Sequence, residues 1–191
     1  MGQPLMNKNE LQDERAWIEA AKQDPEAFRH LFNKYHDRIY NFVLRRMYYR
    51  VLAQDITASA FMKAFKNIKQ FQYKGIPFSA WLYRIAINEI NLHHRKRKRT
   101  VPLTPERSLH LAHESRTDDA IIKSEDDAEK KKRFKKIHEA IGTLKPKYQN
   151  AIALRYFEDK SIREIAEILD LSENTVKTHI HRALHQLREL L

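Results

Sequence analysis

The scarcity of glycine constrains this fold more than any other feature of the sequence. The chain of 191 residues contains three glycines, Gly2, Gly75 and Gly142, so it offers few positions for the tight turns that join antiparallel strands. Its apolar residues recur at spacings of three and four rather than two, which is the period of an amphipathic helix. The sequence therefore predicts an all-α fold.

Four helices are expected in the first half of the chain, each with an apolar face at helical spacing. They cover about residues 10–23, 25–47, 52–68 and 79–90. Asp24 and Ser79 stand where N-caps are expected, because their side-chain oxygens can accept from backbone N–H groups of the first turn. The third helix is expected to bury Ile56, Ala60, Phe61, Ala64 and Phe65. The stretch KQFQYKGIPF contains Gly75 and Pro77 and is predicted to be a loop.

Basic side chains outnumber acidic ones, with 36 Lys and Arg against 25 Asp and Glu for a formal net charge of +11. The excess is concentrated in residues 1–100 and 130–191, whereas residues 101–129 are acidic. Two separate basic blocks are typical of a protein that touches nucleic-acid phosphates with two surfaces. We therefore expect nucleic acid as the anionic partner.

The acidic stretch, residues 101–129, is predicted to be a flexible linker. It contains Pro102 and Pro105, few large apolar residues and an acidic cluster at its end, a composition that does not favour a packed core. We therefore expect two small helical domains, over residues 1–100 and 130–191, joined by this linker.

Several classes of protein are disfavoured by what the sequence lacks. The chain has no cysteine, which excludes disulfides, thiolate zinc sites and cysteine nucleophiles. It has no Gly-rich phosphate loop and no G-x-S-x-G motif, so we expect neither an enzyme nor a bound cofactor. His181 and His185 lie four apart but lack a third ligand, so no metal is expected. No apolar run or secretory signal is present, so we expect a cytoplasmic protein without membrane insertion.

The most specific local signal is the segment SIREIAEILDLSENTVKTHIHRALHQLREL. Ser161 and Glu164 form a capping box and Ser172 is a second N-cap, so two helices with a short turn are predicted. The second helix is expected to bury Val176, Ile180, Ala183, Leu184 and Leu187. Its outward residues are Asn174, Lys177, Thr178, His181, Arg182 and His185. A polar, basic second helix is typical of a helix-turn-helix that enters the major groove, although an ordinary helical hairpin has the same pattern.

Two stretches of the chain resemble one protein family. EIAEILDLSENTVKTHIHRALHQLREL resembles the carboxy-terminal promoter-reading domain of bacterial extracytoplasmic-function sigma factors, and FSAWLYRIAINEINLHHRKRKR resembles their amino-terminal domain. The similarity covers roughly residues 14–100 and 132–191. It implies a promoter-specificity subunit of RNA polymerase, with one domain for the minus-ten element and one for the minus-thirty-five element. The implied partners are promoter DNA and core RNA polymerase, through the clamp helices of its largest subunit and its flap.

In this family the minus-ten domain holds a melted strand with the loop before the WLYRIA helix and with that helix itself. The residues implied are Phe71, Lys74, Phe78, Tyr83, Arg84, Asn88, Arg95 and Lys96. Asn88 would read the edge of a flipped base through its amide, and Arg95 and Lys96 would follow phosphates. The core is expected to hold Trp81, Ile85 and Phe65.

For the minus-thirty-five domain the resemblance places the outward face of the last helix in the major groove. The residues implied are Asn174, Thr175, Lys177, Thr178, His181 and Arg182. Arg182 can be bidentate to guanine, and Asn174 and Thr175 would lie near phosphate at the start of the helix.

The third helix departs from the family pattern. Relatives carry the acidic and glutamine-rich signature D-L-x-Q-E-x-F for docking on polymerase, whereas this chain reads DITASAF. The docking residues are then Asp55, Thr57, Ser59 and Phe61. Either Asp55 and apolar packing suffice, or phosphorylation of Thr57 or Ser59 supplies the missing negative charge. The regulatory partner is correspondingly an anti-sigma protein or a Ser/Thr kinase.

Two other functions fit parts of the sequence. A stand-alone helix-turn-helix regulator, binding duplex DNA as a dimer, would explain residues 130–191 but not the WLYRIAIN half. An RNA-binding protein would use the basic string at residues 93–99. The acidic linker would occupy a nucleic-acid channel of the polymerase, or it is a plain spacer.

Overall fold

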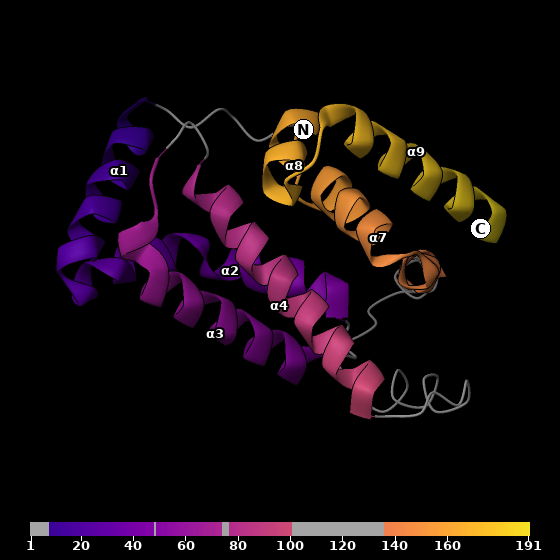
Figure 1. Ribbon diagram of the computed structural model, residues 1–191, viewed down its shortest axis with the longest axis horizontal. Helices are drawn as coiled ribbons and strands as arrows, with labels where there is room; N and C mark the ends of the chain where they lie inside the picture. Colours follow the sequence, from indigo (N-terminus) through magenta and orange to yellow (C-terminus); the bar gives the residue numbers. More distant parts are fainter. Residues whose placement is uncertain (1–7, 48, 74–76, 101–135) are drawn as a thin grey trace, which may run out of the picture. The chain divides into compact units, whose positions relative to one another are not determined.

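The computed structural model of the protein describes residues 8–47, 49–73, 77–100 and 136–191 (Figure 1). Every regular element in these ranges is helical, so the predicted all-α class is confirmed. The chain divides into two compact units, with a boundary after Thr100. The predicted linker over residues 101–129 lies outside the described residues.

The first unit is a bundle organised around one central helix. Its elements are α1 (Lys8–Gln23), α2 (Phe28–Met47), α3 (Arg50–Asn67) and α4 (Phe78–Thr100), with 3₁₀ turns at Pro25–Ala27 and Ile68–Gln70. α2 packs against α1, α3 and α4, and α3 also packs against α4. The apolar stripe of α2, at helical spacing, therefore meets three neighbours at once.

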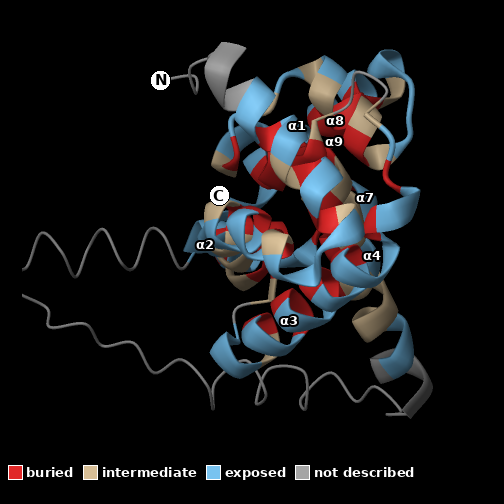
Figure 2. Ribbon diagram, turned by 90° about the vertical axis from the view of Figure 1, so that its left-hand side faces the viewer, coloured by how far each residue is buried: buried red, intermediate tan, exposed pale blue. Residues whose placement is uncertain are grey.

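The core of the first unit lies where α2, α3 and α4 meet (Figure 2). α3 contributes Ala53, Ala60 and Ala64, which are fully buried and let the neighbouring helices approach closely. The predicted burial of Phe65 is wrong. This ring is 36% exposed and packs edge-on against Phe28, with 5.3 Å between centroids, so it borders the core rather than filling it.

Local capping sets where α1 ends and the next turn begins. The Asp24 carboxylate accepts a hydrogen bond from the Glu26 backbone N at 2.9 Å, with Pro25 at the first position of the turn, which confirms the predicted cap. The expectation for Ser79 is wrong. α4 already begins at Phe78, and the Pro77 carbonyl accepts from the backbone N of Ala80 at 3.0 Å.

A buried carboxylate fastens α1 to α2. The side chain of Glu14 is 1% exposed, and its Oε2 accepts hydrogen bonds from the Tyr35 hydroxyl and, at 2.6 Å, from Lys34 Nζ. Burial and the Glu14 carboxylate together raise the pKa of Tyr35 above its ordinary range. The hydrogen bonds of Glu14 to Lys34 and Tyr35 therefore hold α1 against α2.

The second unit is a smaller helical assembly. Residues 136–143 are helical, and α7 (Pro146–Ile152), a π-turn (Ala153–Phe157), α8 (Ile162–Leu169) and α9 (Glu173–Leu190) follow. α7 packs along α9. The buried side chains of these helices include Ile141, Leu144, Ile152, Leu154, Ile165, Val176, Ile180, Ala183 and Leu187.

Two positions of α9 differ from the sequence prediction. Leu184, expected in the core, is 41% exposed, because the buried stripe of α9 runs through Ile180, Ala183 and Leu187 beside it. His179 is buried instead, with its ring edge-on to Tyr148 of α7 at 5.5 Å between centroids. A prediction that places only apolar residues in the core assigns histidine to the surface, and it therefore misses the burial of His179.

Candidate nucleic-acid interface

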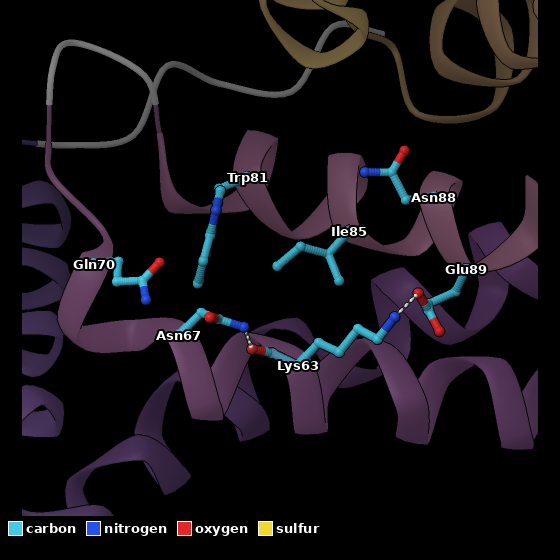
Figure 3. Close-up of a pocket in the computed structure, with 7 residues that line it drawn as sticks. All are labelled: Lys63, Asn67, Gln70, Trp81, Ile85, Asn88 and Glu89. Carbon is cyan, nitrogen blue, oxygen red and sulfur yellow. Dashed lines mark hydrogen bonds and ion pairs between the residues drawn. The ribbon is translucent and has the colours of Figure 1, made fainter. Parts of the chain in front are cut away.

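A pocket of about 360 Å³ opens between α3 and α4 in the first unit (Figure 3). It is lined by Lys63, Asn67, Gln70, Trp81, Ile85, Asn88 and Glu89. Figure 3 shows the side chains of Trp81 and Ile85 pointing from α4 toward α3, whereas Asn88 points away from α3 and forms the rim. The pocket thus combines a flat aromatic wall with amide groups.

The polar side of this pocket is held by contacts between the two helices. Lys63 Nζ of α3 forms an ion pair with Glu89 Oε1 of α4 at 2.5 Å, and only 11% of the Glu89 side chain is exposed. Asn67 Nδ2 donates to the Lys63 carbonyl at 2.8 Å. This hydrogen bond fixes the orientation of the Asn67 amide and therefore of its oxygen. An aromatic face beside amide donors and acceptors suits a nucleobase, which has a π-face and a hydrogen-bonding edge.

The structure brings Asn88 to this pocket, but it does not bring there the aromatic residues that were predicted to contact the same base. Phe71, Phe78 and Tyr83 are 5%, 0% and 3% exposed, so their predicted contact with a base is wrong. Phe71 and Phe78 pack edge-on at 5.3 Å, and Tyr83 packs edge-on against Phe42 at 5.1 Å. These three rings are therefore part of the core of the first unit.

Three of the remaining residues predicted for the minus-ten domain are cations of α4. Arg84 is half-buried, and Arg95 and Lys96 are exposed on the later turns of α4. Lys74 lies outside the described residues. Trp81 and Ile85 are half-buried and line the pocket, so their predicted place in the core is wrong.

Other pocket residues were missed although the sequence carries a signal for them. Lys63 and Asn67 are four apart on α3, and Trp81, Ile85 and Glu89 are four apart on α4. Residues at this spacing share a helix face, so two such stripes facing each other define one groove. Which faces meet depends on packing, and the spacing alone does not give it.

The loop beside the pocket is anchored from α1. The guanidinium carbon of Arg15 lies 4.1 Å from the ring centroid of Tyr73, within the range of a cation–π interaction. Tyr73 follows Phe71, whose ring also packs against Trp81 at 5.1 Å. α1 therefore contacts the segment that directly follows Gln70, a residue of the pocket lining.

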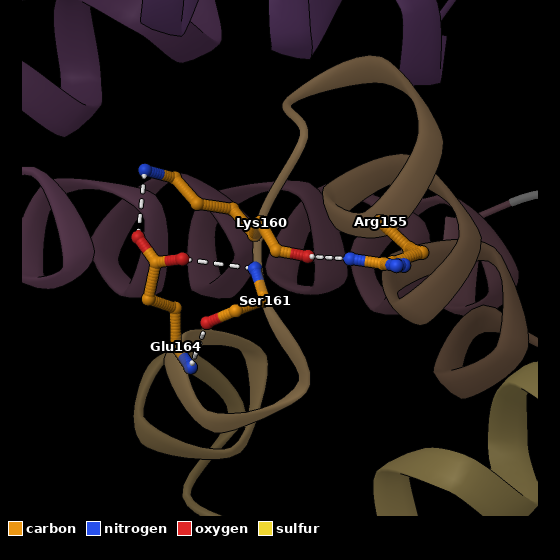
Figure 4. Close-up of polar contacts among 4 residues, drawn as sticks. All are labelled: Arg155, Lys160, Ser161 and Glu164. Carbon is orange, nitrogen blue, oxygen red and sulfur yellow. Dashed lines mark hydrogen bonds and ion pairs between the residues drawn. The ribbon is translucent and has the colours of Figure 1, made fainter. Parts of the chain in front are cut away.

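In the second unit, α8 begins with the predicted capping box (Figure 4). The Glu164 backbone N donates to Ser161 Oγ at 3.2 Å, and the Ser161 backbone N donates to Glu164 Oε2 at 2.8 Å. Burial raises the pKa of Glu164, but hydrogen bonds from Ser161 and the Lys160 ion pair outweigh it and leave that pKa below its ordinary value. Arg155 Nη1 donates to the Lys160 carbonyl at 3.0 Å, which ties the π-turn to this helix start.

The turn into α9 has the geometry of a helix-turn-helix. Asp170 adopts a left-handed conformation with φ 57° and ends α8, and the Leu171 backbone N donates to the Ala166 carbonyl at 3.0 Å. Ser172 then caps α9 by accepting from the Thr175 backbone N at 3.2 Å, as predicted. The two helix starts are therefore fixed by side chains rather than by long-range packing.

The predicted residues of α9 gather on one exposed face. Asn174, Lys177, Thr178, His181 and Arg182 are all exposed. Thr175 is half-buried, with its hydroxyl 2.8 Å from that of Ser172. The Thr178 hydroxyl donates to the Asn174 carbonyl at 2.9 Å. This face is polar and cationic, as a helix needs to be to contact both base edges and phosphates.

The predicted docking residues of α3 divide into an exposed pair and a buried pair. Asp55 and Ser59 are exposed and four apart, so they share a face. Thr57 is 1% exposed and Phe61 is 4% exposed, so the burial predicted for Phe61 is confirmed and neither side chain lies on the exposed surface where docking residues are expected. Phe61 packs edge-on against Phe32 at 4.9 Å. A kinase could not reach the Thr57 hydroxyl without unfolding this helix.

Two general features of the described residues bear on function. None of them forms a group of three or more His, Asp or Glu side chains placed to hold a metal ion. In the part of the chain that the structure describes, no helix has the length and apolarity to cross a bilayer.

Comparison with known families identifies both units. Residues 31–100 match Sigma-70 region 2, and residues 134–187 match Sigma-70, region 4. ECF RNA polymerase sigma factor SigW of Bacillus subtilis is 34% identical over 89% of this chain and 91% of its own length. ECF RNA polymerase sigma factor BldN of Streptomyces coelicolor is 28% identical over 88% of this chain, which spans 61% of BldN.

Two solved structures share the fold. CnrH, in complex with the cytosolic domain of CnrY, has a TM-score of 0.65 at 20% identity, covering 93% of this chain and 96% of CnrH. The sigma factor RpoE of Bartonella quintana, in complex with the anti-sigma factor NepR, has a TM-score of 0.60 at 21% identity, covering 85% of this chain and 95% of RpoE.

Proposed function

This chain belongs to the extracytoplasmic-function sigma factors of bacterial RNA polymerase, and from that premise we propose how its two units share promoter recognition. As a sigma factor it binds RNA polymerase and directs promoter-specific initiation, and it is an initiation factor rather than an enzyme. The first unit holds the melted strand of the minus-ten element. The second unit reads the minus-thirty-five element as duplex, and the protein acts in the cytoplasm beside the polymerase.

The pocket between α3 and α4 is the observation that carries this proposal. Its volume of about 360 Å³ is ample for one nucleobase that has left the stack. Trp81 supplies the aromatic face, and stacking on an aromatic side chain contributes about 1–3 kcal/mol per base. Asn88 at the rim offers an amide that can both donate to and accept from a base edge. Arg95 and Lys96 follow on α4 and supply cations for the strand's phosphates.

The exposed face of α9 supports duplex reading in the second unit. Lys177, Thr178, His181 and Arg182 lie on successive turns, so they meet neighbouring base pairs when the helix lies in the major groove. Arg182 is the specific reader because its guanidinium matches the O6 and N7 acceptors of guanine. Asn174 and Thr175 contact phosphate at the N-terminus of the helix.

A stand-alone dimeric regulator is not favoured, because the family matches cover both units rather than the helix-turn-helix alone. Reconstitution distinguishes the two functions. The purified chain is mixed with core RNA polymerase, and run-off transcripts are measured from a promoter with both elements and from versions with either element scrambled. A sigma factor co-elutes with core polymerase and needs both elements. Shift of a palindrome by the chain alone, without transcription, would support the regulator instead.

Docking on polymerase is proposed to use the exposed face of α3 that carries Asp55 and Ser59. The clamp helices of the largest subunit are the expected partner, with the flap contacting the second unit. This face has fewer carboxylates than the family signature, so charge-assisted contacts are fewer. Phosphorylation of Ser59 by a Ser/Thr kinase would add about −1.5 to −2 of charge next to Asp55 and strengthen docking.

Substitution of Ser59 tests this regulation. Ser59→Glu should bind core polymerase more tightly than Ser59→Ala, measured by anisotropy of the labelled chain. Gln12→Glu on α1 is the matched control, because it adds the same charge at an exposed position away from the docking face. Equal binding by the Ser59 variants would exclude a charge switch. Control by an anti-sigma protein, such as the one bound to RpoE of Bartonella quintana, is then the remaining proposal.

A further inference from the structure

The aromatic side of the pocket between α3 and α4 depends on a cluster of three rings. Trp81 is half-buried and lines the pocket. Two buried rings contact it, because the centroids of Phe71 and Phe78 lie 5.1 and 5.4 Å from that of the indole. Phe71 and Phe78 also pack edge-on against each other. Since aromatic pairs have preferred geometries, the orientation of Trp81 depends on where these two rings are held. We call the three residues the aromatic cluster.

α1 contacts the segment that carries this cluster although it does not line the pocket. The described lining residues come from α3, α4 and the 3₁₀ turn after α3. On α1, the guanidinium carbon of Arg15 lies 4.1 Å from the ring centroid of Tyr73, which is a cation–π contact. Tyr73 follows Phe71 by two residues. The contact with Arg15 therefore restrains the backbone within about 7 Å of Phe71.

The residue before Arg15 makes α1 a fixed support for this contact. The side chain of Glu14 is 1% exposed and accepts hydrogen bonds from the Tyr35 hydroxyl and from Lys34 Nζ of α2. The Tyr35 ring in turn lies 5.8 Å from that of Phe78, so it reaches the aromatic cluster from the core. Arg15 itself is exposed. Because Glu14 is fastened in the core, the backbone of Arg15 cannot move away from the loop without breaking these bonds.

We propose that Arg15 is a positioning residue for minus-ten recognition. By holding Tyr73 it keeps the aromatic cluster in the arrangement in which Trp81 stacks on an unpaired base. The inference rests on the proposed function, because it assigns Trp81 to a base. It goes further in giving α1, a helix outside the pocket, a part in base capture. A surface that is already ordered loses less conformational entropy on binding, so removing the restraint should weaken binding although no contact to DNA is removed.

The first test needs no DNA and examines the aromatic cluster itself. The chain has two tryptophans, so Trp17→Phe leaves Trp81 as the only one, and its fluorescence is quenched with acrylamide in the full chain. Quenching of Trp81 should increase in Arg15→Ala and return toward the original value in Arg15→Lys, which keeps a cation over the loop. Ser161→Ala, which weakens a helix start in the second unit, should leave the quenching unchanged. Equal quenching with and without Arg15 would refute the positioning role.

The second test measures capture of an unpaired strand. Holoenzyme is formed from the full chain and saturating core polymerase. Its dissociation constant is measured by anisotropy of a labelled promoter fragment whose minus-ten element is already unpaired. Arg15→Ala should weaken binding about two- to fivefold, the equivalent of losing one exposed cation–π contact. Lys22→Ala is the matched control, because it removes a cation of α1 that pairs with Glu19, and it should bind as the wild type does.

A double-mutant cycle determines whether Arg15 acts through the aromatic cluster. Trp81→Leu keeps an apolar side chain but removes the stacking face, so Arg15→Ala should cause no further loss in that background. Tyr73→Leu should reproduce the loss of Arg15→Ala, because it removes the ring and leaves the charge of Arg15 in place. A full additional loss in the Trp81→Leu background, or wild-type binding by Tyr73→Leu, would mean that Arg15 contacts the DNA directly. Either result would refute the positioning role.

The same measurements separate this inference from the function on which it rests. If Trp81→Leu weakens binding of the unpaired strand and Arg15→Ala does not, the pocket captures a base without help from α1, and only the positioning role is wrong. If Trp81→Leu binds the unpaired strand as tightly as the wild type, Trp81 does not stack on a base. The proposed use of the pocket then fails together with the positioning role.

Discussion

Glu14 and Tyr35 show how one polar pair can place a whole helix. The carboxylate is buried and accepts from the tyrosine hydroxyl and from Lys34, so removing the hydroxyl leaves a buried charge with one hydrogen bond fewer. Tyr35→Phe should therefore lower the free energy of unfolding by about 1.5–3 kcal/mol, the range for hydrogen bonds to charged groups. Chemical denaturation of the full chain measures this change, and Tyr156→Phe, which removes a hydroxyl from an exposed ring, should have no comparable effect.

The same tyrosine gives a prediction about alkaline pH. Because burial and Glu14 raise the pKa of Tyr35 in the fold, the folded state keeps its proton after the unfolded chain begins to lose it near pH 10.0. Stability from this group is present below that pH and is lost as the pH rises above it. Tyr35→Phe should flatten this alkaline loss. A loss that remains as steep as in the wild type would assign it to another group.

His179 predicts the opposite dependence in the second unit. Its pKa is lowered in the fold by burial and by the Lys147 and Arg182 charges, so the unfolded state binds a proton more readily. Stability is present above the ordinary value of 6.5 and is lost as the pH falls below it. His179→Phe keeps a ring against Tyr148 and should reduce the fall in thermal stability between pH 7 and pH 5. His181→Gln, at an exposed position, should leave it unchanged.

At the scale of elements, three helix or turn starts were predictable, whereas the start of α4 and the burial of the rings that flank the loop before it were not. The caps at Asp24, Ser161 and Ser172 depend on side chains two or three residues away, so a local pattern determines them. Phe71 and Phe78 flank a loop with Gly75, and a loop composition suggests exposure. Their burial comes from packing against each other and Trp81, which no local pattern records.

The cap of α8 carries a prediction for the helix-turn-helix. Ser161→Ala removes the acceptor of the Glu164 backbone N–H and should lower the stability of the second unit by about 1 kcal/mol. Hydrogen exchange of the α8 amides is the suitable measurement, because it reports this element separately from the first unit. Ser59→Ala, in the middle of α3, is the control and should leave α8 exchange unchanged. Unaltered exchange in Ser161→Ala would show that packing alone holds this helix start.

At the scale of the molecule, the two-unit organisation followed from charge and periodicity, whereas the pocket did not. The basic blocks and the helix-turn-helix pattern are carried by contiguous segments, so the sequence reveals them directly. The pocket joins Lys63 and Asn67 of α3 to Trp81 and Ile85 of α4. Such a site depends on which helix faces meet in the fold, and Trp81 was therefore assigned to the core.

The central claim is that one unit holds an unpaired strand while the other reads duplex. The most direct test crosses two variants, Asn88→Ala and Arg182→Ala, with promoters altered in the minus-ten or the minus-thirty-five element, in run-off transcription with core polymerase. Each variant should lose about tenfold or more on the intact promoter, consistent with loss of a good base contact worth about 1–3 kcal/mol. Asn88→Ala should lose no further activity when the base it reads in the minus-ten element is changed, and Arg182→Ala none when its guanine is changed. Defects that ignore which element is altered would contradict the account.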